Sequence, residues 1–268
     1  MQLQKVLALT TGAAAAAGAG LLYYAARVEP ERLVITRPRL KKAVPVKTVF
    51  FSDVHVGKRY APAHLEVIVD AINAQQPELV LFGGDFFAKL PRDIRVLDFE
   101  WIADQLRRIQ APLGKFAVLG NHDVRYGSQP YFYDLLARGG FSVLWNETVQ
   151  LEGGISICGL SPYSSGRTLA QLPAEGYRIC LCHMPDKARY LALGKCDLML
   201  SGHSHDSQVH LPLLDRIILP PGGKMYPYGS YFPQGEDKAQ LFVSRGIGTS
   251  GPPLRLGAAP EIVVLQPE

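Results

Sequence analysis

Four short polar motifs in the sequence each follow directly on an apolar segment. They are Asp53-Val54-His55, Gly84-Asp85, Gly120-Asn121-His122-Asp123 and Gly202-His203-Ser204-His205, and a fifth, Cys182-His183, ends another apolar segment. In α/β sheets, ligands bind beyond the carboxyl ends of the strands, so these side chains can converge on one place. A single His or Asp at a strand end is usually a capping or hydrogen-bonding residue. Five such motifs in register predict a shared site instead.

The residue types in these motifs are those that bind divalent cations. They comprise two carboxylates, four histidines and one carboxamide, namely Asp53, Asp85, His55, His183, His203, His205 and Asn121. This oxygen and nitrogen set suits Mn, Fe, Zn or Mg and needs no thiolate. Two such cations, about 3.5 to 4 Å apart, lower the pKa of a shared water and clamp two phosphate oxygens. Hydrolysis of a phosphate ester is the expected chemistry, with no covalent nucleophile required.

In order and spacing, these motifs resemble the signature of the calcineurin-like metallophosphoesterases, over residues 46–268. The stretch 244–255, which reads SRGIGTSGPPLR, is similar to the membrane-associated bacterial branch that includes UDP-2,3-diacylglucosamine pyrophosphatases. The resemblance implies an α/β fold, namely a four-layer α-β-β-α sandwich of two mixed sheets, preceded here by one N-terminal hydrophobic helix.

The resemblance also implies a role for each motif residue. One metal would take Asp53, His55, Asp85 and His205, and the other would take Asp85, Asn121, His183 and His203, so that Asp85 bridges them. His122 would be the catalytic proton or transition-state donor, and Asp123 would orient it. The cofactors would be two divalent metal ions, chosen from Mn, Fe, Zn and Mg with Mn favoured. A hydroxide that bridges the two metals would attack phosphorus.

The chain departs from this branch after the last motif. Where the branch usually has a Gly-Gly pair, this chain has Asp206-Ser207, followed by Gln208. We expect Asp206 to accept a hydrogen bond from His205 and so to orient that ligand.

Three basic residues are candidates for substrate binding. Lys224 lies in the Tyr-, Pro- and Gly-rich segment 222–235, which either packs through its own aromatic rings or forms an amphipathic lip for an acyl chain or a base. Arg245 and Arg255 flank a Gly-rich turn, and arginine suits bidentate phosphate recognition, although arginines in loops are commonly solvated.

The segments around the motifs predict a β-α-β-α-β arrangement followed by a run of strands. We expect strands at 48–52, 79–82, 116–119, 149–151, 155–159, 178–182, 198–201, 208–211, 241–244 and 262–265, and helices at 63–75, 94–109, 131–138 and after Pro185. Residues 28–46 form a linker or an edge strand. This mixture suggests two sheets packed face to face with helices outside.

Composition favours one folded catalytic domain. The 268 residues are 47% hydrophobic and 19% charged, which is ample for a packed core. Much of the basic excess lies in 27–47, so we expect no nucleic-acid partner, and no obligate protein partner is inferred. The four cysteines lie in or beside apolar segments and read as packing residues.

Residues 6–26 carry no charge and, as a helix, could span the roughly 30 Å core of a bilayer. Basic residues follow this segment, so the positive-inside rule, with weak support from reduced thiols, predicts a single-pass membrane protein whose catalytic domain faces the cytoplasm. The alternative is a cleaved export signal. We therefore expect an anchor or signal at 1–26, a linker at 27–46 and a metallophosphoesterase domain at 47–268.

These features favour a membrane-bound hydrolase that cleaves a phosphodiester or pyrophosphate bond in a phosphorylated, lipid-linked substrate such as UDP-2,3-diacylglucosamine. An exported broad-specificity phosphodiesterase or nuclease is the second hypothesis. A non-catalytic scaffold of the same fold is the third, and the intact ligand set weighs against it.

Overall fold

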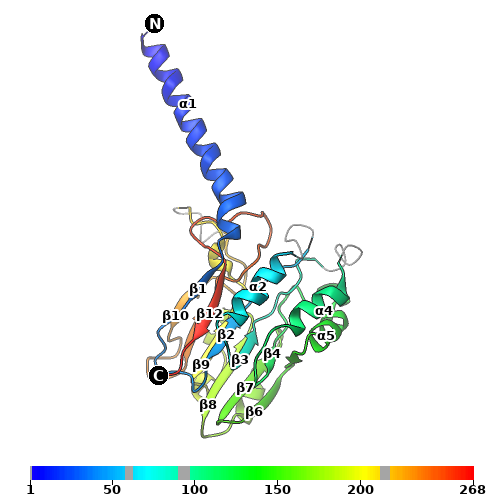
Figure 1. Ribbon diagram of the computed structural model, residues 1–268. Coiled ribbons are helices and arrows are strands. Elements are labelled where there is room, and N and C mark those ends of the chain that lie inside the picture. Colours follow the sequence, from blue (N-terminus) through cyan, green and yellow to red (C-terminus); the bar gives the residue numbers. More distant parts are fainter. Residues whose placement is uncertain (1, 58–62, 90–96, 212–217) are drawn as a thin grey trace.

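The computed structural model describes residues 2–57, 63–89, 97–211 and 218–268 (Figure 1). Two six-stranded sheets pack face to face, and both are mixed. The first has the order β1 (Val34–Thr36), β12 (Glu261–Leu265), β2 (Thr48–Phe51), β3 (Leu79–Phe82), β4 (Lys115–Ala117) and β5 (Ser142–Val143). The second has the order β10 (Gly229–Tyr231), β11 (Gln240–Val243), β9 (Leu198–Ser201), β8 (Tyr177–Cys182), β7 (Ile155–Leu160) and β6 (Glu147–Leu151).

Parallel pairing dominates the centre of each sheet. In the first sheet β2, β3, β4 and β5 run parallel, while β12 is antiparallel to β2. In the second sheet β11, β9, β8 and β7 run parallel, and the edge strands β10 and β6 are antiparallel. Each sheet therefore brings several carboxyl strand ends to the same edge.

Alternate side chains of the buried strands supply two separate cores. On β2, Val49 and Phe51 pack under the helices, whereas Phe50 points between the sheets. On β3, Leu81 joins Phe50 in the core between the sheets. This period of two is the pattern of a strand covered on both faces. The inner layers of the sandwich are thus fixed by strand geometry.

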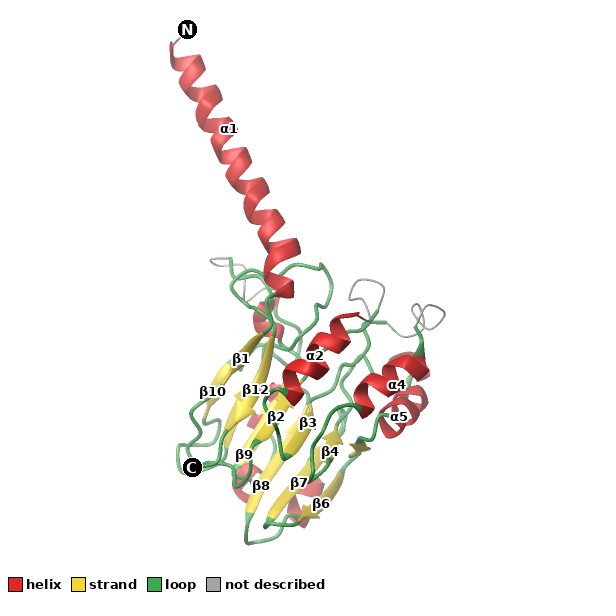
Figure 2. Cartoon of the chain, in the orientation of Figure 1, coloured by secondary structure: helices red, strands yellow, loops and turns green. Residues whose placement is uncertain are grey.

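Helices α2 (Ala63–Asn73), α4 (Phe99–Arg107) and α5 (Gln129–Arg138) cover the outer face of the first sheet (Figure 2). The carboxylate of Asp98 caps α4 by accepting the N–H of Trp101 at 3.0 Å. Over the second sheet the outer layer consists of the short 3₁₀ helices η4 (Arg167–Gln171), η5 (Pro185–Arg189) and η6 (Leu193–Lys195). The predicted four-layer sandwich is confirmed, with one outer layer built from 3₁₀ turns.

The four cysteines lie in the third core, between the second sheet and these 3₁₀ helices. Cys158, Cys180, Cys182 and Cys196 are all buried free thiols. Burial raises the pKa of Cys158 to about 12 and that of Cys182 to about 11, so these thiols stay protonated. Their predicted role as packing residues is confirmed.

Most predicted elements are present, and the exceptions are short. The strand expected at 208–211 is wrong, because Gln208 has a φ of 61° and Val209 makes only isolated bridges to Leu256 and Gly257. Segment 222–235, expected as a loop, contains the edge strand β10. Within the predicted linker, β1 pairs with β12 as an edge strand. Residues 94–96 of the helix expected at 94–109 lie outside the described residues.

The predicted membrane-spanning segment is wrong. Residues 2–23 do form a helix, α1 (Gln2–Tyr23), which extends away from the two sheets (Figure 1). Within the described chain, however, no helix combines the length and the apolar content that crossing a bilayer requires. The centre of α1 is a run of alanine and glycine, which offers little apolar surface for its length. The single-pass membrane localisation is therefore not supported.

The base of α1 contacts the sandwich through two short helices, the π-helix η1 (Tyr24–Val28) and the 3₁₀ helix η2 (Glu29–Glu31). The backbone N–H of Arg255 donates to the carbonyl of Ala25 at 2.8 Å. Glu31 also meets His64 on α2, with 2.7 Å between carboxylate oxygen and Nε2. These contacts fix where α1 leaves the sandwich.

Candidate metal centre

The predicted ligands converge where the carboxyl ends of five strands meet. Asp53 and His55 follow β2, Asp85 follows β3, and Asn121 follows β4 in the first sheet. His183 follows β8, and His203 and His205 follow β9, in the second sheet. The site therefore lies at the seam between the sheets, as ligand binding beyond parallel strand ends predicts.

The backbone at this seam is strained in a way that aims the side chains inward. Asp53, His55, Asp85, His203 and His205 all have φ between 50° and 73°, in the left-handed region that residues with a side chain rarely adopt. Such conformations persist only where the surrounding structure holds them, and they concentrate at functional sites. The N–H of Asp53 donates to Gly84 at 2.8 Å and that of His55 to Asp85 at 3.2 Å, which holds the two turns together.

Glycines leave room for the carboxylates. A Cβ on Gly120 would lie 2.0 Å from Oδ1 of Asp85, and one on Gly202 would lie 2.1 Å from Oδ2 of Asp53. The glycine that precedes Asn121 and the one that precedes His203 are therefore steric requirements of the site.

One group of side chains gathers around Asp53. Its ligand atoms, together with those of His55 and His205, all lie within 4.8 Å of one another. Nε2 of His55 is 3.0 Å from Nε2 of His205, which in turn is 3.5 Å from Oδ1 of Asp53. Asp85 Oδ2 lies 3.9 Å from His55 Nε2 and completes the group.

A second group gathers on the other side of Asp85. The ligand atoms of Asp85, His183 and His203 lie within 4.8 Å of one another. Nε2 of His183 is 3.2 Å from Oδ2 of Asp85, and its Nδ1 is 2.8 Å from the carbonyl of Gly83. That carbonyl accepts the Nδ1 proton and so directs Nε2 toward the carboxylate.

Buried polar atoms at the seam that lack a hydrogen-bond partner in the described part of the chain include Asn121 Oδ1, His183 Nε2 and His55 Nδ1. Leaving a buried polar atom unpaired is unfavourable, and each such atom needs an explanation. Asn121 and His183 are two of the residues that the family resemblance assigns to one cation. The residues present therefore fit a dinuclear site in which Asp85 is shared.

Three of the four ligand histidines at the seam are held in the neutral form that binds metals. Burial lowers the pKa of His55 to about 3 and that of His203 to about 4. Burial also lowers the pKa of His205 well below its usual range. Neutral imidazole is the state that ligates a cation, so these rings need lose no proton.

The two carboxylates create a local excess of negative charge. Burial raises the pKa of Asp53 to about 6, and the Asp85 carboxylate acts in the same direction. Burial acts to lower the pKa of His183, but the carboxylates of Asp85 and Asp53 outweigh it and raise that pKa to about 10. The same excess charge favours a bound divalent cation.

The predicted partnership between Asp123 and His122 is wrong. The carboxylate of Asp123 accepts the backbone N–H groups of Asp85 at 2.7 Å, Phe86 at 2.9 Å and Gly120 at 2.8 Å. It therefore joins the turn after β3 to the turn after β4. The His122 ring is oriented instead by the carbonyl of Ala88, 2.7 Å from its Nδ1. A backbone oxygen has no signature in the sequence, so this partner could not be predicted.

The predicted bond from His205 to Asp206 is also wrong. Asp206 pairs with His210, with 3.1 Å between Oδ2 and Nε2. Nδ1 of His205 instead faces the guanidinium of Arg255 at 3.5 Å. Asp206 has a φ of 52°, which turns its side chain away from the ligand before it.

Arg255 lies beneath the site, fully buried. Its guanidinium donates to the carbonyls of Gly248 at 2.6 Å, Ala258 at 2.6 Å and Arg245 at 3.0 Å. This placement suits a residue that holds the loop after β11 and supports His205, rather than one that touches substrate.

Arg245 and Lys224 lie outside the ligand groups. The Arg245 guanidinium is 3.0 Å from the buried carboxylate of Glu261 and sits 4.5 Å from the ring centre of Tyr228. Lys224 is exposed, and its backbone N–H donates to Asp186 at 3.0 Å. Tyr226 and Tyr231 pack 5.0 Å apart between ring centres, so segment 222–235 is held by its own aromatics.

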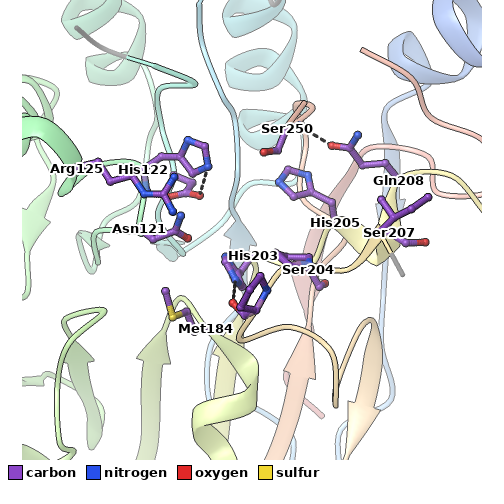
Figure 3. A pocket seen from close by; sticks show the side chains of 14 residues that line it. Asn121, His122, Arg125, Met184, His203, Ser204, His205, Ser207, Gln208 and Ser250 are labelled. Carbon is purple, nitrogen blue, oxygen red and sulfur yellow. Dashed lines mark hydrogen bonds and ion pairs between the residues drawn. The ribbon is translucent and has the colours of Figure 1, made fainter. Parts of the chain in front are cut away.

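A cavity of about 460 Å³ opens over the ligand groups (Figure 3). Asp85, Asn121, His203 and His205 are among its lining residues. In Figure 3, His122 and Arg125 lie on one side together with Asn121, and His205 lies on the other side. Arg125 was not among the residues predicted from the sequence, where only its position three residues after His122 points to the site. The sequence also did not reveal that Gln208 would hold the opposite wall, where its Oε1 accepts the N–H of Ser250 at 2.5 Å.

Comparison with known proteins shows which family this chain belongs to. Residues 46–207 match the family model described as calcineurin-like phosphoesterase. The chain is 34% identical to the uncharacterized metallophosphoesterase YkuE of Bacillus subtilis, over 96% of this chain and 92% of that protein.

Two further relatives carry more specific names. The chain is 29% identical to phosphodiesterase YaeI of Escherichia coli, over 94% of each chain. It is 26% identical to UDP-2,3-diacylglucosamine pyrophosphatase LpxG of Chlamydia muridarum, over 91% of this chain and 92% of that protein.

Proposed function

Because the chain belongs to the calcineurin-like phosphoesterase family, we propose that its site hydrolyses a phosphodiester or pyrophosphate bond with two divalent cations. The family and its named members make the chain a metal-dependent phosphoester hydrolase. One cation would be held by Asp53, His55, Asp85 and His205, and the other by Asp85, Asn121, His183 and His203. A mixed carboxylate and imidazole set is compatible with Mn, Fe, Zn or Mg, among which we favour Mn.

The observation that carries this proposal is the pair of ligand groups that share Asp85. Ligand atoms lie within 4.8 Å of one another in the buried group Asp53, His55 and His205 and in the buried group Asp85, His183 and His203. Asp85 links the two, because its Oδ2 lies 3.9 Å from Nε2 of His55. Bound there, two divalent cations would supply an activated water and neutralise phosphate oxygens. The chain's own contribution is to fix the ligands through strained turns, glycines and the carboxylate of Asp123.

His122 is placed to transfer a proton to the leaving oxygen. Its Nδ1 is held by the carbonyl of Ala88, so Nε2 is the nitrogen that faces the cavity. Nε2 lies 4.0 Å from Oδ2 of Asp85, close to the reacting centre but outside hydrogen-bond reach of that carboxylate. When protonated, His122 can donate to the oxygen that leaves phosphorus.

The names of two relatives support a substrate with more than one phosphoester or anhydride link. YaeI is named a phosphodiesterase, and LpxG is named a pyrophosphatase of UDP-2,3-diacylglucosamine. We therefore propose a phosphorylated, lipid-linked nucleotide of that kind as the first physiological candidate. The cavity beside Met184, Ile218 and Pro220 supplies apolar surface that suits such a molecule.

Asp85→Ala tests the proposal, because Asp85 alone is assigned to both cations. We expect loss of both metals and no measurable hydrolysis, whereas Asp237→Ala, which alters an exposed carboxylate, should change neither. Metal content is measured by mass spectrometry after loading with Mn²⁺. Activity is measured on a generic phosphodiester, a phosphomonoester and UDP-2,3-diacylglucosamine.

Two outcomes would contradict the proposal in different ways. If Asp85→Ala loses only one metal and still turns over, Asp85 does not bridge. If the wild-type protein binds two cations but hydrolyses none of the three compounds, the scaffold hypothesis is favoured.

A further inference from the structure

A second cavity adjoins the first at His122. It has a volume of about 800 Å³ and shares His122, Arg125 and Ser250 with the cavity over the ligand groups. Of the proposed ligands, Asp85, Asn121 and the two histidines of the last motif line the first cavity alone, whereas His55 lines the second alone. Since most of these ligands, Asp85 among them, line the first cavity, we place the phosphorus atom there, and His122 stands on the border between the two.

The second cavity carries positive charge. Among its lining residues in the described chain are Lys89 and Arg125, both exposed, and none is an Asp or a Glu. Arg125 is the one cationic side chain that lines both cavities, and it lies on the same side as His122 in Figure 3. A guanidinium in that position can grip a phosphate group through two parallel hydrogen bonds.

The far wall of the second cavity is held in place. It consists of residues 249–253, and Gln208 fixes this segment through Ser250 and through the carbonyl of Pro252, 3.3 Å from Gln208 Nε2. The two prolines offer apolar surface without charge. A ligand in this cavity would therefore find Arg125 at the border with the first cavity, Lys89 within the second cavity, and an uncharged wall at residues 249–253.

We propose that the second cavity is the leaving-group subsite and that Arg125, aided by Lys89, binds a phosphate group of the leaving group. This inference rests on the proposed function, since it takes the scissile phosphorus to lie over Asp85. The substrate class is a phosphoric anhydride, in which an oxygen joins the scissile phosphorus to a second phosphoryl group. That second group would stand at the border, next to His122 and Arg125.

The reaction balances as a hydrolysis. Water adds its oxygen to the scissile phosphorus, and the bond from that phosphorus to the bridging oxygen breaks. The bridging oxygen leaves on the second phosphoryl group and takes a proton from His122. The attacking water releases one proton to solvent, and His122 takes one back from solvent, so the enzyme is restored. The products are two phosphomonoesters.

Arg125→Ala in the Mn²⁺-loaded protein tests the inference with two substrates. Diadenosine diphosphate has a phosphate in its leaving group, whereas bis-p-nitrophenyl phosphate has none. We expect the ratio of kcat/KM for the anhydride to kcat/KM for the diester to fall by about 10- to 100-fold, which corresponds to the loss of a charge-assisted hydrogen bond. Arg125→Lys should recover part of this ratio, and Arg167→Ala, at an exposed arginine outside both cavities, should leave it unchanged.

The outcomes separate this inference from the proposed function. If Arg125→Ala loses equal activity on the two substrates, the ratio is unchanged and the subsite is rejected, while the proposed hydrolase function is kept. The same conclusion follows if the wild-type protein cleaves the diester but not the anhydride. If the wild type cleaves neither compound, the proposed function fails and the subsite fails with it. Because Arg125 is exposed, both of its variants should fold, which circular dichroism verifies.

Discussion

Gly120→Ala should disable the site without touching a ligand. A Cβ at this position would lie 2.0 Å from Oδ1 and 2.6 Å from Cγ of Asp85, and real Cβ atoms essentially never come closer than 3.0 Å to another heavy atom. The carboxylate or the turn must therefore shift by about 1 Å. Asp85 cannot give way easily, because Asp123 holds its backbone N–H at 2.7 Å and its φ is already 57°.

The size of the effect follows from that displacement. A misplacement of about 1 Å at a reacting centre costs on the order of 10²-fold in rate, which equals about 2.7 kcal/mol of transition-state stabilisation. Metal–ligand distances tolerate only about 0.2 Å, so the affinity for both cations should fall as well. We expect kcat/KM on a generic phosphodiester to drop at least about 10²-fold and the metal content to fall at both sites.

Gly194→Ala is the matched control for this change. A Cβ there meets no atom within 4 Å, so its activity and metal content should equal those of the wild type. Metal content by mass spectrometry, kcat/KM and Tm are measured for both variants. If Gly120→Ala keeps two cations and wild-type turnover, the carboxylate can relax freely and the steric reasoning is refuted.

Three further predictions concern neighbouring parts of the molecule. His122→Ala should keep both cations but lower kcat by roughly 10²- to 10⁴-fold, the range for a positioned proton donor, and a parallel loss of metal would make His122 a ligand instead. Arg255→Ala leaves several buried carbonyls unpaired, so it should destabilise the protein by about 3 kcal/mol or more and lower Tm by about 6 to 12 °C, while Arg167→Ala should not. Burial lowers the pKa of Lys115 to about 8, below its value in the unfolded chain, so between pH 8 and 10 the unfolded state binds more protons than the folded state. The stability of the wild type relative to Lys115→Met should therefore rise over this range. A difference in Tm between the two proteins that stays flat or falls would contradict this.

The sequence predicted the strands and the ligand positions because both leave local signals. Buried strands such as β2 and β3 are short apolar runs, and each ends in a polar motif at the point where a parallel strand presents its carboxyl end. The bridging role of Asp85 was implied by the family resemblance rather than by the strand pattern. The structure brings Asp85 close to ligands from both sheets, and its role as a bridge stays a prediction.

What could not be predicted depends on backbone atoms and on unusual φ angles. Ala88 orients His122 through a carbonyl, and Asp123 bonds three N–H groups rather than a side chain. The strand expected at 208–211 fails because Gln208 adopts a positive φ, which an apolar pattern does not reveal. The absence of charge in residues 6–26 favours a membrane span. Helix α1 is nevertheless too weakly apolar to be one, because its centre consists of alanine and glycine.

The position of the site at the seam has a mechanical consequence. Asp53 and Asp85 belong to one sheet and His183 and His205 to the other, so each proposed cation would fasten the two sheets together. Sliding of one sheet over the other would then require release of both ions. Cation binding therefore opposes unfolding of the whole sandwich, by about 2.7 kcal/mol per independent site at a free concentration of one hundred times Kd. The ions that serve hydrolysis would also cross-link two sheets whose ligands are far apart in sequence.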